Sequence, residues 1–432
     1  MIEKSHLTAL DGDEDIEGID AKWSTFVDGL DGYLYGVPYN APRAVKFDPI
    51  SKSMEEIGPD FGEGGMKWGC GVRAVTNDCI YCAPCYAKYM LKINTKNGIV
   101  ETMENTDLPE SGDYLWVSGA VAADNHIYYM PADARYILRL NTYKDTLSSV
   151  GNDLGKGWNK YCGTVAGNNG FMYGIPDEAN RILKFNPTDP HYNNVSFWCG
   201  QGTFGFSTNG VLGIDGNIYI LNNHGRVLKL DDVNESLSWI GEDIPYPAGL
   251  KSPQWGNPIV GADNCIYWPP YRANRVIKFD PITQESPSLV GDDLRAQSDC
   301  PKWMAGALAN NGVIYCVPDG GTNQVLAINP LEDFIAKLRN NISQSPLELG
   351  RLFEKRSSCG ENLYMSAVRK FGVDKVLELI EKCLISFIEE SIDQKKRYDY
   401  IVPPFVLAAA CDNSQLTLVY HLLRNDVQAI FR

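Results

Sequence analysis

Residues 264–281 read NCIYWPPYRANRVIKFDP, and this stretch contains the pattern that decides the fold. An Asp-Asn pair at 263–264 precedes a short apolar run around Tyr267, and a second apolar run follows at 276–279. Prolines at 269–270 lie between the two runs, so the segment is typical of two antiparallel strands joined by a turn. A two-stranded hairpin is not stable by itself, so further strands must pack against it.

The same unit occurs seven times along the chain, with its shared tyrosine at intervals of 45 to 48 residues. Each copy begins with an Asp or Asn dipeptide suited to a tight hairpin turn. Each then gives up to four short strand signals, as at 71–75, 80–82, 90–93 and 99–102. Four antiparallel strands repeated at this length predict the blades of a β-propeller. The shared tyrosines are Tyr35, Tyr81, Tyr128, Tyr173, Tyr219, Tyr267 and Tyr315.

We therefore predict a mainly β protein, with a seven-bladed β-propeller over residues 1–330 and a small all-α region over 331–432. The seventh unit lacks a fourth strand, because the sequence after Pro330 turns helical in pattern. Residues 5–13, SHLTALDGD, match the fourth-strand segment 286–293 of the sixth unit in type. Residues near 5–10 are therefore expected to complete the last blade and remove an exposed sheet edge.

Composition excludes several classes of protein. The formal net charge of −15 argues against nucleic-acid binding, which needs a basic face. The sequence has no signal-peptide pattern and no run of 18 apolar residues, so we expect no membrane contact and a monomer in the cytoplasm, with the nucleus as an alternative. The 12 cysteines are expected to be reduced and to act as small buried hydrophobes.

The repeat unit resembles those of kelch, NHL and lactonase-like propellers over residues 5–330. The kelch double glycine after the second strand is absent. In the tail, residues 363–380 and 404–423 resemble degenerate ankyrin helix pairs, with Tyr364 and Val406 at the position of the ankyrin histidine. Both resemblances imply recognition of a protein partner more than they imply a particular activity.

An aromatic residue stands 12 or 13 positions before each shared tyrosine. In a propeller, these positions lie near the mouth of the central channel, where a collar of rings could stack on a sugar, a cation or a peptide side chain. The alternative is that each ring packs between blades as part of the repeat itself. The candidates are Trp23, Trp68, Trp116, Tyr161, Phe206, Trp255 and Trp303.

Arginines occupy matching places between the second and third strands of four units, at Arg43, Arg181, Arg226 and Arg275. They are candidates for recognising a carboxylate or phosphate. The alternative is that they lie over tyrosines or pair with acidic loops.

No cofactor is expected, although calcium or magnesium could bind the acidic pairs at 152–153, 242–243 and 292–293. The alternative is that these pairs are solvated turns. A zinc site is not expected at Cys79, Cys82 and Cys85, because residues three apart on a strand point to opposite faces.

The expected inner strands lack histidine and carry little charge, and no nucleophile or phosphate-binding motif occurs elsewhere. The sequence therefore favours a non-catalytic scaffold that binds a protein or another ligand through the propeller face and the tail. The alternative is a lactonase- or lyase-like enzyme that has a divalent cation near the channel and uses loop carboxylates such as Asp60, Asp153 and Asp292.

Overall fold

The computed structural model describes residues 6–9, 21–104, 108, 112–189, 194–198, 208–244, 254–294, 300–330 and 376. Contacts between Cα atoms divide the chain into two units, Met1–Asn329 and Pro330–Arg432. The first unit is a seven-bladed β-propeller, as the repeat predicts. The predictions of an all-α, ankyrin-like region over 331–432 lie outside the described residues, apart from Val376, which is helical.

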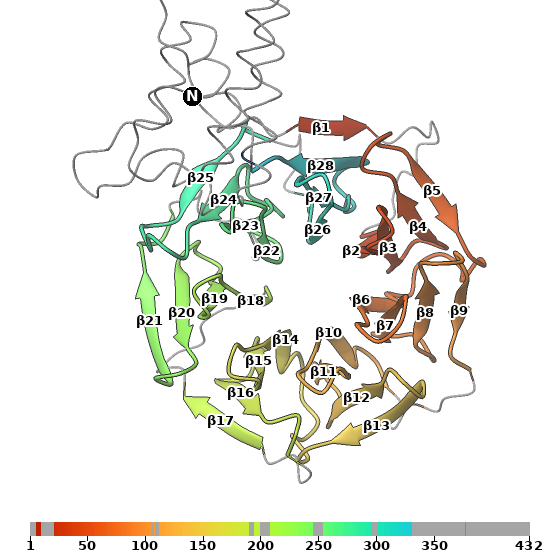
Figure 1. Ribbon diagram of the computed structural model, residues 1–432, viewed down its shortest axis with the longest axis horizontal. Helices are drawn as coiled ribbons and strands as arrows, with labels where there is room; N and C mark the ends of the chain where they lie inside the picture. Colours follow the sequence, from red (N-terminus) through yellow and green to blue (C-terminus); the bar gives the residue numbers. More distant parts are fainter. Residues whose placement is uncertain are drawn as a thin grey trace, which may run out of the picture. The chain divides into compact units, whose positions relative to one another are not determined.

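Each blade is a four-stranded antiparallel sheet, and the seven blades stand around a central axis (Figure 1). Blade 1 has β2 (Trp23–Asp28), β3 (Leu34–Pro38), β4 (Ala44–Phe47) and β5 (Met54–Ile57); blade 2 has β6 (Trp68–Arg73), β7 (Cys79–Pro84), β8 (Leu91–Asn94) and β9 (Val100–Thr102); blade 3 has β10 (Trp116–Val121), β11 (Ile127–Pro131), β12 (Ile137–Asn141) and β13 (Thr146–Val150).

The remaining blades repeat this order from the inner to the outer strand. Blade 4 has β14 (Tyr161–Ala166), β15 (Met172–Pro176), β16 (Arg181–Phe185) and β17 (Asn194–Trp198); blade 5 has β18 (Gly210–Leu212), β19 (Ile218–Leu221), β20 (Val227–Asp231) and β21 (Ser236–Ile240); blade 6 has β22 (Ile259–Val260), β23 (Ile266–Trp268), β24 (Val276–Phe279) and β25 (Ser288–Val290); blade 7 has β26 (Gly306–Leu308), β27 (Ile314–Cys316), β28 (Gln324–Ile328) and, from the other end of the chain, β1 (His6–Ala9).

Strand β1 confirms the predicted closure of the ring. It pairs antiparallel with β28, and His6 lies opposite Ala327 in the register. Figure 1 shows the red N-terminal strand beside the cyan β28 at the outer edge of blade 7. A strand from the beginning of the chain thus covers the edge that the seventh unit leaves open.

Every shared tyrosine is anchored to the turn before it. In all seven blades its hydroxyl hydrogen-bonds the Asp or Asn side chain four residues earlier, at 2.7 to 3.1 Å, as Tyr35 does with Asp31. The same Asp or Asn also accepts a bond from the backbone N–H two residues after itself, which closes an Asx turn. One residue pair therefore makes the hairpin and holds the buried ring.

The same anchors join neighbouring blades. The Tyr35 hydroxyl is 3.3 Å from the Thr95 carbonyl oxygen of blade 2, and the Asn77 amide donates to the Thr142 carbonyl of blade 3 at 2.9 Å. The Tyr315 hydroxyl donates to the Pro49 carbonyl at 3.2 Å, so the last blade is bonded to the first in the same way. We call the side of the propeller that carries these anchors the tyrosine face.

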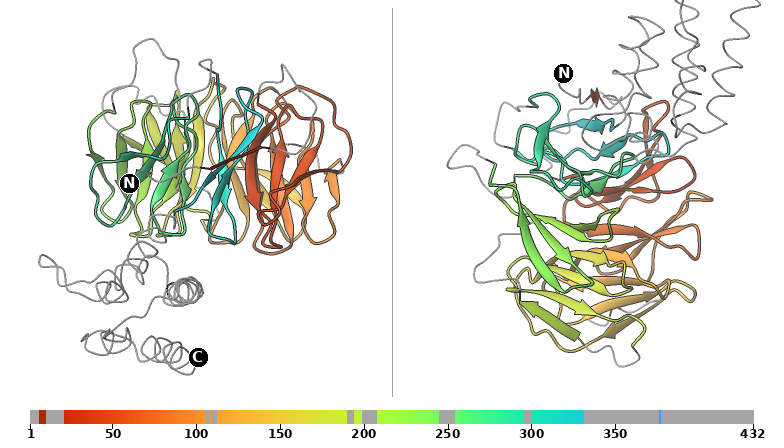
Figure 2. Two further views of the ribbon diagram at one scale, coloured as in Figure 1. Left: turned by 90° about the horizontal axis from the view of Figure 1, so that it is seen from above. Right: turned by 60° about the vertical axis from the view of Figure 1, so that its left-hand side comes forward.

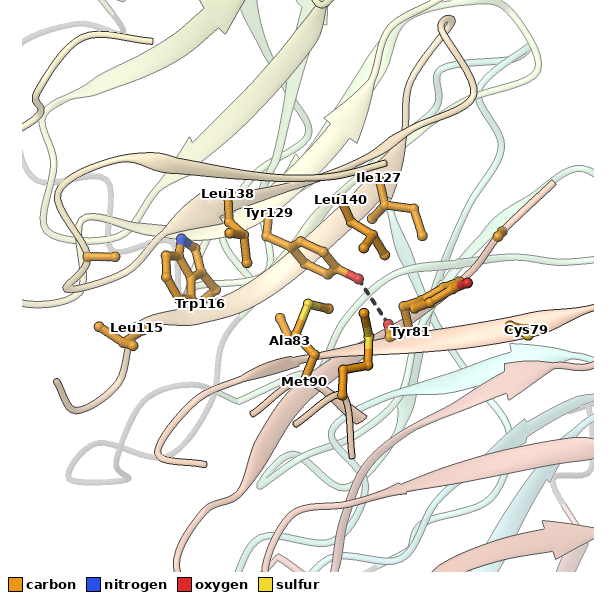
Figure 3. Close-up of a cluster of buried hydrophobic side chains, with 13 residues drawn as sticks. Cys79, Tyr81, Ala83, Met90, Leu115, Trp116, Ile127, Tyr129, Leu138 and Leu140 are labelled. Atoms are coloured by element: carbon orange, nitrogen blue, oxygen red, sulfur yellow. Dashed lines mark hydrogen bonds between the residues drawn. The ribbon is translucent and has the colours of Figure 1, made fainter. Parts of the chain in front are cut away.

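The core consists of seven apolar clusters, each of which lies between two adjacent blades. Figure 3 shows the cluster between blades 2 and 3, where the Tyr129 hydroxyl donates to the Tyr81 carbonyl at 3.0 Å. Fully burying one such large apolar side chain stabilises the fold by about 1.5–3 kcal/mol. Because the clusters follow one another around the ring, each blade depends on both of its neighbours.

Figure 2 shows the propeller from the side, with strands running between its two faces. We call the face opposite the tyrosine face the cavity face, since the turns between second and third strands and the entries into the inner strands lie there. Within the described part of the chain, no helix has the length and apolar character needed to cross a membrane. Five of the eight described cysteines are buried, and the reduced state of the cysteines stays a prediction.

Candidate functional site

Backbone hydrogen bonds fix the rim of the cavity face. A proline follows the shared tyrosine by three residues in six blades. The backbone of the residue after that proline bonds to its own blade, to the next blade, or to both. In blade 1, for example, the Tyr39 N–H donates to the Lys22 carbonyl at 3.0 Å, and the Tyr39 carbonyl accepts from the Lys67 N–H of blade 2 at 2.7 Å. The backbone thus holds this position in place whatever side chain it carries.

The bonds between blades recur at Cys85, Ala132 and Tyr271, whose carbonyls accept from the N–H groups of Leu115, Lys160 and Lys302 at 2.7 to 3.0 Å. We call the residue after the shared proline the rim position. Its members are Tyr39, Cys85, Ala132, Asp177, Tyr271 and Asp319.

Six of the repeated aromatics are described and buried; four of them begin inner strands, and Trp255 and Trp303 lie a few residues before theirs. Five indole N–H groups donate to the backbone carbonyl 20 or 21 residues later in the same blade, at 2.7 to 3.2 Å. These bonds connect the inner strand to the turn between the second and third strands. This placement is consistent with the alternative that each ring packs between blades as part of the repeat. Contact between these rings and a ligand stays a prediction. The donors are Trp23, Trp68, Trp116, Trp255 and Trp303.

The other two blades depart from this arrangement. Tyr161, buried at the start of β14, has no indole, and Phe206 lies outside the described residues. Of the seven candidates, Trp23 lines the cavity described below. An open collar of rings is therefore not what the described residues present.

The four arginines are not brought together at the channel. The Arg43 guanidinium lies along blade 1, 3.6 Å from Glu56, and Arg226 lies over the Trp239 ring at 5.2 Å. Arg181 is exposed and Arg275 is partly buried. None of the four lines the cavity, and the carbonyls of Arg43 and Arg275 accept two of the indole bonds. Anion recognition by these four residues stays a prediction.

A cavity of about 350 Å³ opens at the mouth of the channel on the cavity face. Six of the seven blades contribute to its wall, through the first residues of their inner strands and through the rim position. Four rim residues reach it: Tyr39, Asp177, Tyr271 and Asp319. Tyr114 and Cys162 lie between them, and the remaining wall is made by Ala21, Trp23, Ser24, Gly69, Val117, Asn257 and Met304.

Asp177 is an acid of the cavity whose pKa is raised. Burial, followed by the negative charge of the neighbouring Glu178, raises the pKa of Asp177 to about 6. Burial also raises the pKa values of Tyr114 and Cys162, and the charge of Asp177 adds to the rise in both. These three groups therefore form one acidic corner of the cavity, in which the carboxylate loses its proton near neutral pH.

The opposite wall is held by backbone and amide contacts. The Asp319 carboxylate is buried and accepts from the Gly320 N–H at 2.6 Å. The Asn257 N–H donates to the Met304 carbonyl at 2.6 Å, which joins blades 6 and 7. At the repeat position of Asn257, the Asn209 side chain of blade 5 donates to the Ser118 hydroxyl of blade 3 at 3.3 Å, and the Asn209 N–H donates to the Asn257 side chain at 3.0 Å. Polar side chains thus connect blades 3, 5 and 6 at this level of the inner strands.

A lysine precedes the inner-strand aromatic in four blades, a signal that the sequence analysis did not use. The Lys22 ammonium donates to the Asn323 side chain of blade 7 at 2.7 Å, and Lys67 donates to the Gly62 and Gly64 carbonyls at 2.8 Å. Burial lowers the pKa of both lysines. These ammonium groups are used in contacts to the preceding blade, and their side chains are not in the cavity wall. The four are Lys22, Lys67, Lys160 and Lys302.

No group of three or more His, Cys, Asp or Glu side chains that would suit a metal ion occurs among the residues that the structure describes. Asp153 pairs with Arg135, and this arginine lowers the pKa of the Asp153 carboxyl. Cys79, Cys82 and Cys85 are buried thiols whose pKa values are raised by burial. Calcium or magnesium at the acidic pairs stays a prediction.

Sequence patterns alone did not identify Tyr39, Tyr114, Asp177, Tyr271 and Asp319 as residues of the site. Four of them follow the shared proline, and this position differs in chemistry from blade to blade while its neighbours repeat. That contrast is the signal that could have identified them. Tyr114 is distinguished only by its backbone, since its φ of 54° is in the left-handed region, as is that of Ala21.

No protein-family model and no curated protein sequence matches the chain. Among solved structures, the chain is similar to virginiamycin B lyase from Staphylococcus aureus, in a catalytically inactive histidine-to-alanine variant with quinupristin. The TM-score is 0.59 at 11% identity, and the match covers 75% of this chain and 98% of that one. A streptogramin B lyase gives a TM-score of 0.59 at 13% identity, with 75% and 97% covered.

The hydrazine synthase of Kuenenia stuttgartiensis is also similar, with a TM-score of 0.51 at 10% identity and with 74% of this chain and 99% of that one covered. At such identities, the likeness establishes the propeller fold alone. The chemistry of this chain must therefore be argued from its own cavity.

Proposed function

We propose that this protein is a recognition module that holds a positively charged group of its ligand in the cavity at the mouth of the channel. The lining of the cavity carries the proposal. Asp177 and Asp319 supply carboxylates, and Tyr39, Tyr114 and Tyr271 supply aromatic rings. Rings and carboxylates together bind ammonium and guanidinium groups through cation–π contacts and charge-assisted hydrogen bonds.

The size and position of the cavity support a binding role. Its volume of about 350 Å³ suits a small molecule or one long side chain of a partner. Backbone hydrogen bonds join Tyr39 and Tyr271 to the next blade and hold Asp177 and Asp319 within their own blades, so little ordering is needed when a ligand enters. This proposal keeps the scaffold predicted from the sequence and moves the site from the repeated aromatics to the rim position.

Titration of the full-length protein with Nα-acetyl-arginine amide, guanidinium and tetramethylammonium, followed by NMR or calorimetry, tests the proposal. We expect millimolar binding that weakens at least tenfold in Asp177→Asn. Since the pKa of Asp177 is about 6, binding should strengthen as pH rises from 5 to 7.5, because the carboxylate must be ionised to attract a cation.

Asp292→Asn is the matched control, because it makes the same change of charge at an exposed residue that does not line the cavity. It should leave the affinity unchanged. Equal binding of acetate, or equal losses in Asp177→Asn and Asp292→Asn, would show that the cavity does not select cations through Asp177.

A second candidate function is a lyase-like enzyme, and one observation favours it. Asp177 has a pKa of about 6 and lies in a cavity beside Tyr114 and Cys162, so it could accept or donate a proton near neutral pH. The fold is similar to that of virginiamycin B lyase. In that lyase the inactive variant lacks a histidine, whereas the described residues lining this cavity include none.

Incubation of the protein with quinupristin, with the products followed by mass spectrometry, separates the two candidates. Under the recognition proposal, quinupristin remains intact. If quinupristin is turned over, and this activity is lost in Asp177→Asn but kept in Asp292→Asn, the cavity is a catalytic site and the recognition proposal is wrong.

A further inference from the structure

An exposed aromatic residue stands beside the cavity. Trp158 has 84% of its surface exposed, in the segment that leads from β13 into β14. A single exposed apolar side chain is ordinary on a folded surface, whereas several that lie together indicate an interaction site. Tyr86 and Met66, at 42% and 44%, are also exposed on the cavity face.

Contacts join these residues into one arc over blades 2, 3 and 4. The Tyr86 N–H donates to the Met66 carbonyl at 3.2 Å, and the rings of Tyr86 and Tyr114 meet at 6.1 Å in an edge-to-face arrangement. The Asp133 N–H in turn donates to the Tyr114 carbonyl at 3.0 Å. We call Met66, Tyr86, Tyr114 and Trp158 the aromatic ridge.

The link from Asp133 to Trp158 completes the arc. The Asp133 carboxylate accepts from the Asn159 N–H at 2.7 Å, and Asn159 follows Trp158 directly. Met66, Tyr114 and Asn159 all have φ values between 43° and 54°. A left-handed backbone at three non-glycine residues costs energy, which the surrounding hydrogen bonds must offset. Tyr114 also lines the cavity, so the ridge and the cavity are continuous.

Charges of both signs lie along the ridge: Lys88 and Lys156 are exposed, and Arg135 pairs with Asp153. Asp113 and Asp133 lie near the Tyr86 ring, and their charges add to the rise in its pKa that burial causes. Glu178 is exposed next to Asp177. Lys156 is the exposed cation of the same segment, and the Lys160 N–H is bonded to blade 3. Aromatic side chains flanked by carboxylates complement a segment that carries both apolar and basic residues.

We infer that the ridge and the cavity together bind a basic segment of a partner protein. A lysine or arginine side chain of the segment enters the cavity, and an apolar side chain next to it lies on Tyr86 and Trp158. This inference rests on the proposed function and names the class of ligand. The ridge supplies the aromatic anchor that a small cation would not contact.

Capture from a degenerate peptide library tests the inference without assuming a sequence. The full-length protein is immobilised, exposed to peptides with four randomised positions, and the retained peptides are sequenced by mass spectrometry. We expect enrichment of Lys or Arg within two positions of an aromatic or long aliphatic residue. Enrichment of acidic peptides, or no enrichment, overturns the inference.

The affinity of an enriched peptide for variants of the protein then distinguishes the contribution of the ridge from that of the cavity. Trp158→Ala should weaken the peptide about tenfold, which corresponds to about 1.4 kcal/mol, and leave Nα-acetyl-arginine amide unaffected. Asp177→Asn should weaken both. Tyr143→Ala, which removes a 65% exposed aromatic residue on the tyrosine face, is the control and should change neither.

The two proposals fail in different ways. If Nα-acetyl-arginine amide binds through Asp177 but Trp158→Ala leaves the peptide affinity unchanged, the ridge does not bind a peptide and the proposed function stands. If neither probe binds through Asp177, both proposals are wrong.

Discussion

The seven blades carry the same side chains on one face of the propeller and different side chains on the other. On the tyrosine face, all seven blades use the same pair of groups, a buried tyrosine hydroxyl and an Asp or Asn side chain four residues earlier. On the cavity face, the rim position keeps its backbone bonds but holds tyrosine, cysteine, alanine or aspartate according to the blade. Repetition within this chain therefore marks what builds a blade, and departure from it marks where the surface can acquire a specific function.

The largest expected effect is on the tyrosine face. Asp263 is 3% exposed, accepts from the Tyr267 hydroxyl at 2.9 Å, and lies 3.1 Å from the Lys278 ammonium. Asp263→Ala should lower the free energy of unfolding by about 3–5 kcal/mol, because it leaves a buried hydroxyl and a partly buried ammonium without this carboxylate. Urea unfolding measures the change.

The exposed Asp292 provides the comparison for that prediction, since Asp292→Ala should change the free energy of unfolding by less than about 0.5 kcal/mol. Equal effects of the two substitutions would mean that the anchors on the tyrosine face do not stabilise the blades.

A smaller effect is expected for the buried indoles of the cavity face. Trp116 is fully buried and donates to the Tyr136 carbonyl at 3.2 Å. Trp116→Phe removes this bond and part of the buried ring, so we expect a loss of about 2 kcal/mol in thermal or urea unfolding. Trp158→Phe, at an exposed position, should be neutral. If Trp116→Phe does not change the free energy of unfolding, the ring does not stabilise the blade. A role in ligand binding would then be open to it, and the contrast between repeated and varied positions would be weaker.

The smallest effect has the opposite sign. The folded-state pKa of Asp177, about 6, is above the unfolded value of about 3.9, so the folded protein binds the extra proton between these values. The contribution of Asp177 to the free energy of unfolding is therefore present at low pH and is lost as pH rises through 6. Asp177→Asn should raise the melting temperature modestly at pH 7.5 and change it little at pH 4. A lower melting temperature at pH 7.5 would mean that the charge on Asp177 stabilises the fold.

The sequence predicted the fold well because the decisive signals are local. The tyrosine spacing, the Asp or Asn dipeptides and the short apolar runs each act within one blade, and the ring follows when seven such units pack side by side. The closing strand near residues 5–10 was predicted from a missing partner in the last unit and is confirmed by the pairing of His6 with Ala327.

The site was predicted less well, because its residues become neighbours only in the closed ring. Asp177 and Asp319 occupy the same position in blades 4 and 7, and nothing local to either one shows that both reach one cavity. The raised pKa of Asp177 depends on burial by residues from other blades. The repeated aromatics recur in every unit, and the described ones are buried, so their recurrence is consistent with packing, while a role in ligand binding stays a prediction.

The closing strand also has a consequence for synthesis. About 320 residues separate His6 from its partner Ala327, so β1 leaves the ribosome first and finds its place last. At about 5–20 residues per second, the wait is on the order of half a minute. During that time blades 1 to 6 can form in order, but blade 7 cannot be completed. The entropy cost of closing a loop rises only slowly with its length, so the distance between β1 and β28 affects the time of closure more than its free energy. During that time the edge of β1 is unpaired, as an edge strand is when it can pair with another chain.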